Sequence, residues 1–525
     1  MKKKTLDMVI FAVVALLFSL VAMLTPVFRR NSDATCSPLV FLVALLVFAL
    51  AYFGLDMLID WVRKKPLKLR HRVPDRKLRW SLFGLFCLIG LWNLLLYYPG
   101  VGMYDTLKII STKVIYIGRQ HPWFFCTIVR GILLGCQTLG FGYETALLVC
   151  SILQILVTAW VYSFVLMWLR EKKVHPVIWL IAVGFYALTP ILGLYMVTLL
   201  KDIPYGLLLT AWVPVLYEYW QTKGQCIQTK KYMDICILLV ILSLLRNNGI
   251  YVSAFIIVAM LVVSFRQWKR LCTLLVALAL VVIGSNALED YNDITHLFRE
   301  TVGIPLQQIA ATVTYGGEIT DEQLEFIDRV LPVEYIKEHY DPYSVDKIKL
   351  GGSPIDDDFL NENKGRFLKV WLELLPKNFG IYVEAYLKNT YGFWSLDNRD
   401  YNVKYTTIYQ ADWADWLVEK GVDYKNVFPQ PVQQFFEAIA TPLLKTLGAG
   451  SFLWIYILLL ILLIRRNDWR ILLIAAPSIG CWLTLMISTP VAYQWRYLFS
   501  VPITIPILFA LLFVKKKKKT APAVT

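Results

Sequence analysis

Long apolar runs recur along most of the chain, and they restrict its fold more than any other feature. A helix needs roughly 20 apolar residues to cross a bilayer. Hydrophobic residues make up 57% of the 525 residues and charged residues 17%, whereas soluble domains hold about 45–50% and about 25%. The sequence therefore predicts an all-α, polytopic membrane protein with about 12 transmembrane helices, and it argues against a soluble enzyme. The expected crossings lie near 7–28, 38–60, 80–98, 143–169, 176–198, 203–220, 232–245, 250–264, 270–287, 450–464, 471–488 and 497–514.

The distribution of charge predicts the orientation of these helices. The formal net charge is +15, but residues 288–449 carry −11 and the rest of the chain carries +26. Lys and Arg gather in short loops, for example nine of them within 63–79, and such loops face the cytoplasm. Both termini are therefore expected in the cytoplasm of a multi-pass plasma-membrane protein. A nucleic-acid partner would not divide the charge in this way, so none is expected.

These patterns predict four parts. Residues 1–287 form an N-terminal transmembrane core, whose outer loop 99–142 carries interfacial helices. Residues 288–449 form an acidic, mostly helical extracytoplasmic domain. Residues 450–514 form the C-terminal transmembrane helices, and 515–525 form a basic cytoplasmic tail.

Three segments need separate interpretation. The apolar stretch 122–139 either spans the membrane or lies on its outer face. We favour the second, because a crossing there would move the charges at 170–173 outside. The runs 232–245 and 250–264 are short, so they form either a re-entrant hairpin or two tilted helices. Arg29-Arg30, just outside the first span, is a mild exception to the charge rule.

Polar side chains converge on the predicted outer face from distant parts of the sequence. Ionisable residues near a membrane are costly and often functional. The candidates are Tyr104 and Asp105, then Gln120 and His121, then Lys201 and Asp202, then Arg246, Asn247 and Asn248, and finally Arg496 and Tyr497.

The sequence is compatible with two roles for each of four charged candidates. Asp105 is suited to take a proton from a hydroxyl acceptor, or it is the N-cap of a short interfacial helix. Lys201, Arg246 and Arg496 are suited to bind a phosphate, or they reach the membrane interface in the ordinary way or pair with Asp202.

The remaining candidates are also open. His121 is an acid/base, a phosphate-binding donor or an ordinary interface residue, and Asn247 and Asn248 equally suit the capping of broken helix ends. Asp356 and its two acidic neighbours favour an N-cap over a metal site. No metal-binding spacing is present, and the nine cysteines show no disulfide pattern.

The arrangement resembles the GT-C glycosyltransferases, which are polytopic enzymes that use polyprenyl-phosphate-linked sugars. It is similar in particular to an uncharacterised bacterial family of this type. The resemblance covers roughly 80–265 and the last two spans. It rests on Asp105, His121-Pro122, Lys201-Asp202 and Arg496-Tyr497.

The resemblance implies a transfer of sugar from a polyprenyl-phosphate lipid to an extracytoplasmic glycan, lipid or protein acceptor, with membrane lipids around the enzyme. Asp105 would be the general base, and Lys201, Arg246 and Arg496 would neutralise the leaving phosphate. The chain departs from the family pattern at Tyr104 and Gln494, where many relatives carry acids.

No cofactor is certain, and a divalent cation stays open. The alternative from another class is a polytopic transporter or a lipid-linked-glycan flippase. Twelve crossings and a broken helix at Arg246 suit such a protein, but the sequence shows no repeat and no matching broken segment in its other half.

Overall fold

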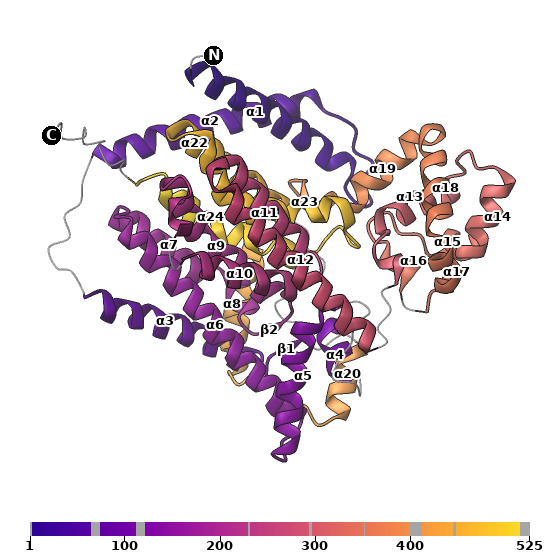
Figure 1. Cartoon of the computed structure of the whole chain (residues 1–525), viewed down its shortest axis with the longest axis horizontal. Helices are drawn as coiled ribbons and strands as arrows, with labels where there is room; N and C mark the ends of the chain where they lie inside the picture. Colours follow the sequence, from indigo (N-terminus) through magenta and orange to yellow (C-terminus); the bar gives the residue numbers. More distant parts are fainter. Residues whose placement is uncertain are drawn as a thin grey trace.

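The computed structural model describes residues 3–64, 74–111, 121–228, 231–292, 297–350, 352–397, 412–444 and 448–514. The described chain is almost entirely α-helical (Figure 1). Seven of its helical segments are long and apolar enough to cross a membrane. The prediction of an all-α membrane protein is confirmed at this level. The seven segments are Lys4–Val27, Pro38–Lys64, Asp75–Leu96, Tyr143–Glu171, Phe265–Tyr291, Ala449–Arg466 and Trp469–Ser488.

In the described residues up to 292, the N-terminal part holds twelve α-helices and both strands of a two-stranded sheet. Helices α1 and α2 pack against each other, and α3 packs along α6. The helices are α1 Lys3–Val27, α2 Pro38–Lys64, α3 Asp75–Leu96, α4 Tyr104–Ser111, α5 Trp123–Thr138, α6 Tyr143–Glu171, α7 Pro176–Leu188, α8 Pro190–Tyr195, α9 Asp202–Gln221, α10 Lys231–Leu245, α11 Gly249–Val263 and α12 Trp268–Tyr291. The strands are β1 Val101–Gly102 and β2 Thr198–Leu199, and short 3-10 turns lie at Gln225–Gln228 and Phe265–Gln267.

One expected span is broken. The run 176–198 forms α7, then α8, then β2. Pro190 lacks a backbone N–H and disfavours the helical conformation of the residue before it. Thr189 accordingly has φ −77° and ψ 111°, an extended geometry. The segment expected to cross at 176–198 is therefore not one continuous helix, and the break carries the chain into β2.

The part after residue 297 divides in two. A compact unit over 298–393 has its own hydrophobic core, which includes Leu306, Phe326 and Leu374. Helices α20 and α21 instead pack on the membrane body, against α4 and α8. The elements are η3 Phe298–Glu300, α13 Gly303–Thr314, α14 Asp321–Val330, α15 Val333–His339, α16 Asp346–Lys349, α17 Asp357–Glu362, α18 Lys364–Lys377, α19 Phe379–Asn389, η4 Tyr391–Phe393, α20 Asp412–Glu419 and α21 Gln430–Leu444.

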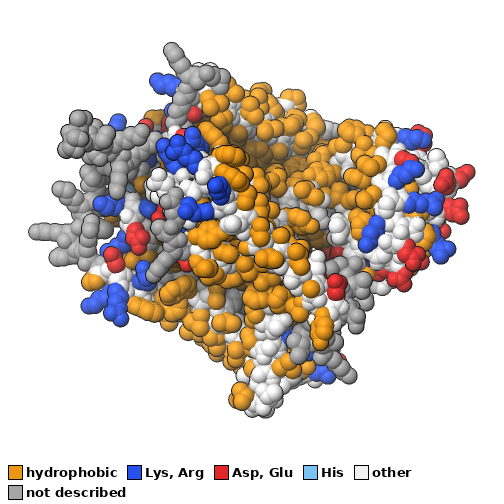
Figure 2. Space-filling view, viewed as in Figure 1, with side chains coloured by type: hydrophobic (Ala, Val, Ile, Leu, Met, Phe, Trp, Pro, Cys, Tyr) orange, Lys and Arg blue, Asp and Glu red, His pale blue; other side chains and the backbone are white. Residues whose placement is uncertain are grey.

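Side-chain caps begin two helices of the compact unit, and the one at Asp356 was predicted. Thr320 and Gln323 form a capping box at the start of α14. The Asp356 side chain accepts a hydrogen bond from the Phe359 N–H at 2.9 Å, so it is the N-cap of α17. Figure 2 shows charged side chains gathered over this unit, whereas apolar side chains cover the middle of the molecule.

The C-terminal helices complete the body and join it to the compact unit. They are α22 Ala449–Arg466, η5 Trp469–Ala475, α23 Ala476–Ser488, η6 Trp495–Leu498 and α24 Ser500–Leu511. The Val345 N–H donates to the Pro490 carbonyl at 2.9 Å, and the Ala492 N–H donates to the Tyr343 carbonyl at 2.9 Å. The compact unit is therefore docked on the loop that leads to Arg496. The predicted basic tail 515–525 lies outside the described residues.

Candidate functional site

A two-residue parallel ladder sets the position of the first outer loop. Val101 pairs with Thr198, and Gly102 pairs with Leu199. The ladder joins a segment just before α4 to a segment just before α9. Asp105 lies three residues after β1, and Lys201 lies two residues after β2. The pairing of the strands therefore brings the two side chains together.

Side chains of helix α6 hold this ladder in place by hydrogen bonds. The Gln154 Nε2 donates to the Tyr195 carbonyl at 2.8 Å and to the Thr198 carbonyl at 2.7 Å. The Ser151 hydroxyl donates to the Pro99 carbonyl at 3.1 Å. Gly100 has φ +128°, and a Cβ there would lie 1.9 Å from the Ser151 Oγ. This approach requires glycine, because any side chain would push the loop off α6.

Asp105 lies in the first turn of α4, where two cations bind one of its oxygens. The Lys201 Nζ lies 3.2 Å from Oδ2, and the Arg496 guanidinium lies 3.1 Å from the same oxygen. Tyr104 begins the helix, so Asp105 is inside it and does not have the N-cap position. The next residue, Thr106, anchors α4 by donating to the Leu199 carbonyl.

A second carboxylate lies deeper. Asp202 is 1% exposed, and its oxygens lie 3.2 Å from Arg246 and 3.5 Å from Arg496. One nitrogen of Arg496 therefore bridges Asp105 and Asp202. Its Nε donates to the Gln494 side chain at 3.0 Å, which fixes the guanidinium plane.

Tyr497 contacts two arginines. The centre of its ring lies 4.9 Å from the Arg246 guanidinium carbon and 5.0 Å from that of Arg496. An aromatic face attracts a cation, so the ring stabilises two like charges that would otherwise repel. We call Asp105, His121, Lys201, Asp202, Arg246, Arg496 and Tyr497 the outer-loop cluster.

His121 joins the cluster through Lys201. Its Nδ1 lies 2.8 Å from the Lys201 Nζ, and the residue is 5% exposed. Burial and the neighbouring Lys201 charge lower the pKa of His121 to about 3. The imidazole is therefore neutral over the physiological range.

Asp105 is ionised despite its partial burial. Burial alone would raise its pKa, but the charges of Lys201 and Arg496 outweigh this effect and hold the pKa well below its usual value. With Lys201, Arg246 and Arg496 positive and Asp105 and Asp202 negative, the cluster carries an excess of one positive charge. It is thus suited to receive an anion.

Some predicted site residues lie elsewhere. Asn248 donates to the Thr484 hydroxyl at 2.7 Å and joins α11 to α23. Asn247 is exposed in the turn and lies apart from the cluster contacts. Gln120 and the side chain of Tyr104 lie outside the described residues.

One supporting residue escaped the sequence analysis. Arg130 on α5 is buried and donates to the Ile109 and Ile110 carbonyls at 3.3 and 3.2 Å. These carbonyls end α4, and a cation there also suits the helix dipole. The available signal was a single arginine within the apolar run 122–139, where a charge needs a specific partner.

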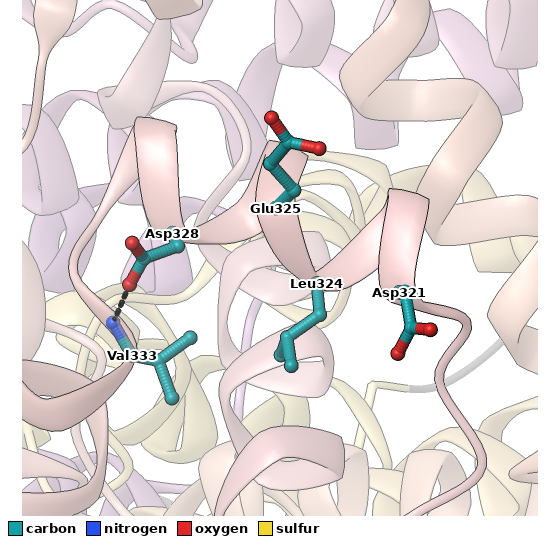
Figure 3. Close-up of a pocket in the computed structure, with 5 residues that line it drawn as sticks. All are labelled: Asp321, Leu324, Glu325, Asp328 and Val333. Atoms are coloured by element: carbon teal, nitrogen blue, oxygen red, sulfur yellow. Dashed lines mark hydrogen bonds between the residues drawn. The ribbon is translucent and has the colours of Figure 1, made fainter.

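The compact unit carries a separate hollow of about 340 Å³. Figure 3 shows its lining, which comes from α14 and the start of α15, with the Val333 N–H donating to the Asp328 carboxylate at 2.8 Å. Within the described ranges, no group of three or more His, Cys, Asp and Glu side chains is arranged to hold a metal ion. The lining residues are Asp321, Leu324, Glu325, Asp328 and Val333.

One family model matches the chain, over residues 109–524, and it is described as a family of unknown function (DUF6020). The match includes His121, Lys201, Arg246 and Arg496, and it begins shortly after Asp105. No curated protein and no solved structure matches the chain significantly.

Proposed function

The chain belongs to this family of unknown function, and we propose that it is a membrane glycosyltransferase of the GT-C type. In this proposal it moves a sugar from a polyprenyl-phosphate donor to an extracytoplasmic acceptor of the cell envelope. A membrane body is suited to hold the lipid tail of such a donor, and the units outside it are suited to meet the acceptor.

The observation that carries the proposal is the convergence of Lys201 and Arg496 on one oxygen of Asp105, at 3.2 and 3.1 Å. A transfer from a lipid phosphate needs a base for the acceptor hydroxyl and cations for the leaving phosphate. Both are present within one partly buried cluster. In such surroundings preorganised charges stabilise a transition state more strongly than they do in water.

In the proposed step, Asp105 is the base, and Lys201 and Arg496 bind the leaving phosphate. The acceptor oxygen forms a bond to the anomeric carbon, and the bond between that carbon and the phosphate oxygen breaks. The acceptor proton passes to Asp105, and the electron pair leaves with the polyprenyl phosphate. Lys201 and Arg496 turn from Asp105 toward this phosphate as its charge grows. Because their charges lower the pKa of Asp105, their departure makes Asp105 a stronger base.

We also propose twelve crossings, with both termini in the cytoplasm of a plasma-membrane protein. The seven long helices supply seven of these crossings, and the other five are α7 Pro176–Leu188, α9 Asp202–Gln221, α10 Lys231–Leu245, α11 Gly249–Val263 and the C-terminal segment Trp495–Leu511. In the proposed topology α5 lies on the outer face, and short helices such as α10 and α11 pair within the bundle.

Ion pairs at the helix ends support the orientation. Arg30, just after α1, lies 2.6 Å from Asp341, and Arg29 lies 3.5 Å from Asp397. Both acids belong to the acidic block 288–449. The positive charges of Arg29 and Arg30, which were an exception to the charge rule, are therefore paired with acids that lie close in space. At the other end of the helices, Arg466 of α22 lies 2.7 Å from Asp60 of α2, as expected if both ends face one side.

Cysteine labelling tests this topology. In a variant without the nine native cysteines, we expect a membrane-impermeant maleimide on intact cells to label a cysteine placed within 340–360. A cysteine placed within 64–77 should react only after the cells are permeabilised. The opposite pattern would place the outer-loop cluster in the cytoplasm and would contradict the proposed function.

Removal of the gene tests the function itself. We expect cells without the protein to lose one glycosidic linkage from their envelope glycans and to accumulate the polyprenyl-phosphate sugar that is no longer used. Glycan linkage analysis and mass spectrometry of extracted lipids measure the two effects. An intact glycan profile, with no lipid-linked sugar accumulating, would refute the proposal.

A further inference from the structure

The contact between Lys201 and His121 determines where the imidazole carries its proton. A lysine ammonium has three donors and no acceptor. The His121 Nδ1, 2.8 Å from the Lys201 Nζ, must therefore be the acceptor. A neutral imidazole has one N–H, so the proton is on Nε2. By the geometry of the ring, the Nε2–H bond points away from Lys201.

The Nε2–H group has no acceptor within the described parts of the chain. His121 is buried, and its Nε2 has no hydrogen-bond partner among the residues that the structure describes. A buried donor without an acceptor is costly. Such a donor beside a cluster with excess positive charge indicates that the acceptor comes from a bound anion.

We propose that His121 is a neutral hydrogen-bond donor to a phosphate oxygen of the substrate, with its proton held on Nε2 by Lys201. This inference rests on the proposed function and deepens it. It separates two roles: Asp105 receives the acceptor proton, whereas His121 binds the phosphate and exchanges no proton.

The surroundings keep the imidazole in this form. Lys201, Lys108 and Arg496 act on His121 as positive charges, and Asp105 opposes them. Together with burial, the positive charges disfavour the imidazolium. His121 is also a poor base in this state, because Nδ1 already accepts from Lys201 and Nε2 already carries a proton.

Two substitutions separate the two nitrogens. His121→Gln places an amide N–H near the position of Nε2, so it keeps the distal donor. His121→Asn reaches only as far as Nδ1, so it keeps the contact with Lys201 and loses the distal donor. A structural role at Lys201 would favour the Asn variant, whereas the proposed role favours the Gln variant.

The tautomer is measured directly by ¹⁵N NMR of the histidine-labelled protein in detergent, with the His121→Asn spectrum assigning the signal. We expect Nε2 to be protonated and Nδ1 to be unprotonated from neutral pH down to about pH 5. That pH is well below the ordinary His pKa of about 6.5. A signal that titrates near that ordinary pKa, or one with the proton on Nδ1, would overturn the inference without any use of substrate.

Phosphate binding is measured with two separate probes. The first is a vesicle that contains polyprenyl phosphate, and the second is inorganic phosphate in solution. A hydrogen bond to a charged group is worth about 1.5–3 kcal/mol, which corresponds to about 10- to 100-fold in affinity. We expect His121→Asn to weaken binding by about this factor and His121→Gln to stay near the wild type. Binding to vesicles alone would identify the lipid as the source of the phosphate, and binding to both probes would identify the phosphate group itself.

The outcomes distinguish the two proposals. If the wild type binds neither probe, the proposed function fails and this inference fails with it. If the wild type binds but the folded His121→Asn variant binds equally well, only the inference is overturned. Gel filtration of each purified variant shows whether it is folded.

Discussion

Replacement of Asp105 by Asn is expected to abolish glycan transfer while the protein still inserts and folds. The amide has nearly the same shape and still accepts hydrogen bonds from Lys201 and Arg496, which lie 3.2 and 3.1 Å from the carboxylate. It does not take the acceptor proton. Loss of a general base lowers a rate by about 10²- to 10⁴-fold, which in cells removes the product linkage. Linkage analysis of envelope glycans from cells that make the variant measures the effect.

Asp423→Asn is the matched control. Asp423 is also a carboxylate paired to a lysine, 2.8 Å from Lys425, but its side chain is 68% exposed. We expect this variant to leave the glycans unchanged. Unchanged glycans in the Asp105→Asn cells, with the protein made and inserted, would contradict the catalytic role of Asp105. The transporter or flippase alternative predicts impaired movement of a solute or lipid without a direct defect in bond formation.

Replacement of Asp202 by Asn is expected to destabilise the protein strongly. Asp202 is almost fully buried and is the partner of Arg246, at 3.2 Å, and of Arg496, at 3.5 Å. Removal of one member of a buried ion pair leaves an uncompensated charge and costs about 3–5 kcal/mol. The variant should have a clearly lower Tm in detergent, measured by thermal unfolding of the purified protein.

Two comparisons make this result specific. Glu325→Gln removes an exposed carboxylate from α14 and should leave the Tm near that of the wild type. The double variant Asp202→Asn with Arg246→Gln removes both charges of one pair, so it should recover part of the lost stability. A Tm of Asp202→Asn equal to that of the Glu325→Gln control would show that Asp202 is not the counter-charge of these arginines.

The sequence predicts the convergence of the cluster but not its contacts. The pattern of basic loops predicts that Asp105, Lys201, Arg246 and Arg496 lie on one side of the membrane, and their side chains do meet in one cluster. The ladder of β1 and β2, which pairs Val101 with Thr198, has no sequence signal because each strand is two residues long. The Lys201–His121 contact depends on that pairing, so it was equally hidden.

Local capping signals were reliable because they act within one turn of helix. Asp356 has the expected capping contact at the start of α17. The break at Pro190 also has a local signal, but the prediction of a crossing at 176–198 rested on apolar length alone. Arg29 and Arg30 illustrate the opposite limit. Their acidic partners lie more than 300 residues away in sequence, so no local pattern could identify them.

The most direct test of the central claim is a structure of the protein determined in the presence of its lipid-linked sugar. The proposed function predicts density for a phosphate between Lys201 and Arg496, with the anomeric carbon of the sugar facing Asp105. The contacts of both cations with Asp105, 3.2 and 3.1 Å in the free protein, should lengthen. Density for the phosphate away from these residues, with the outer-loop cluster unchanged, would contradict the assignment of this cluster as the site of transfer.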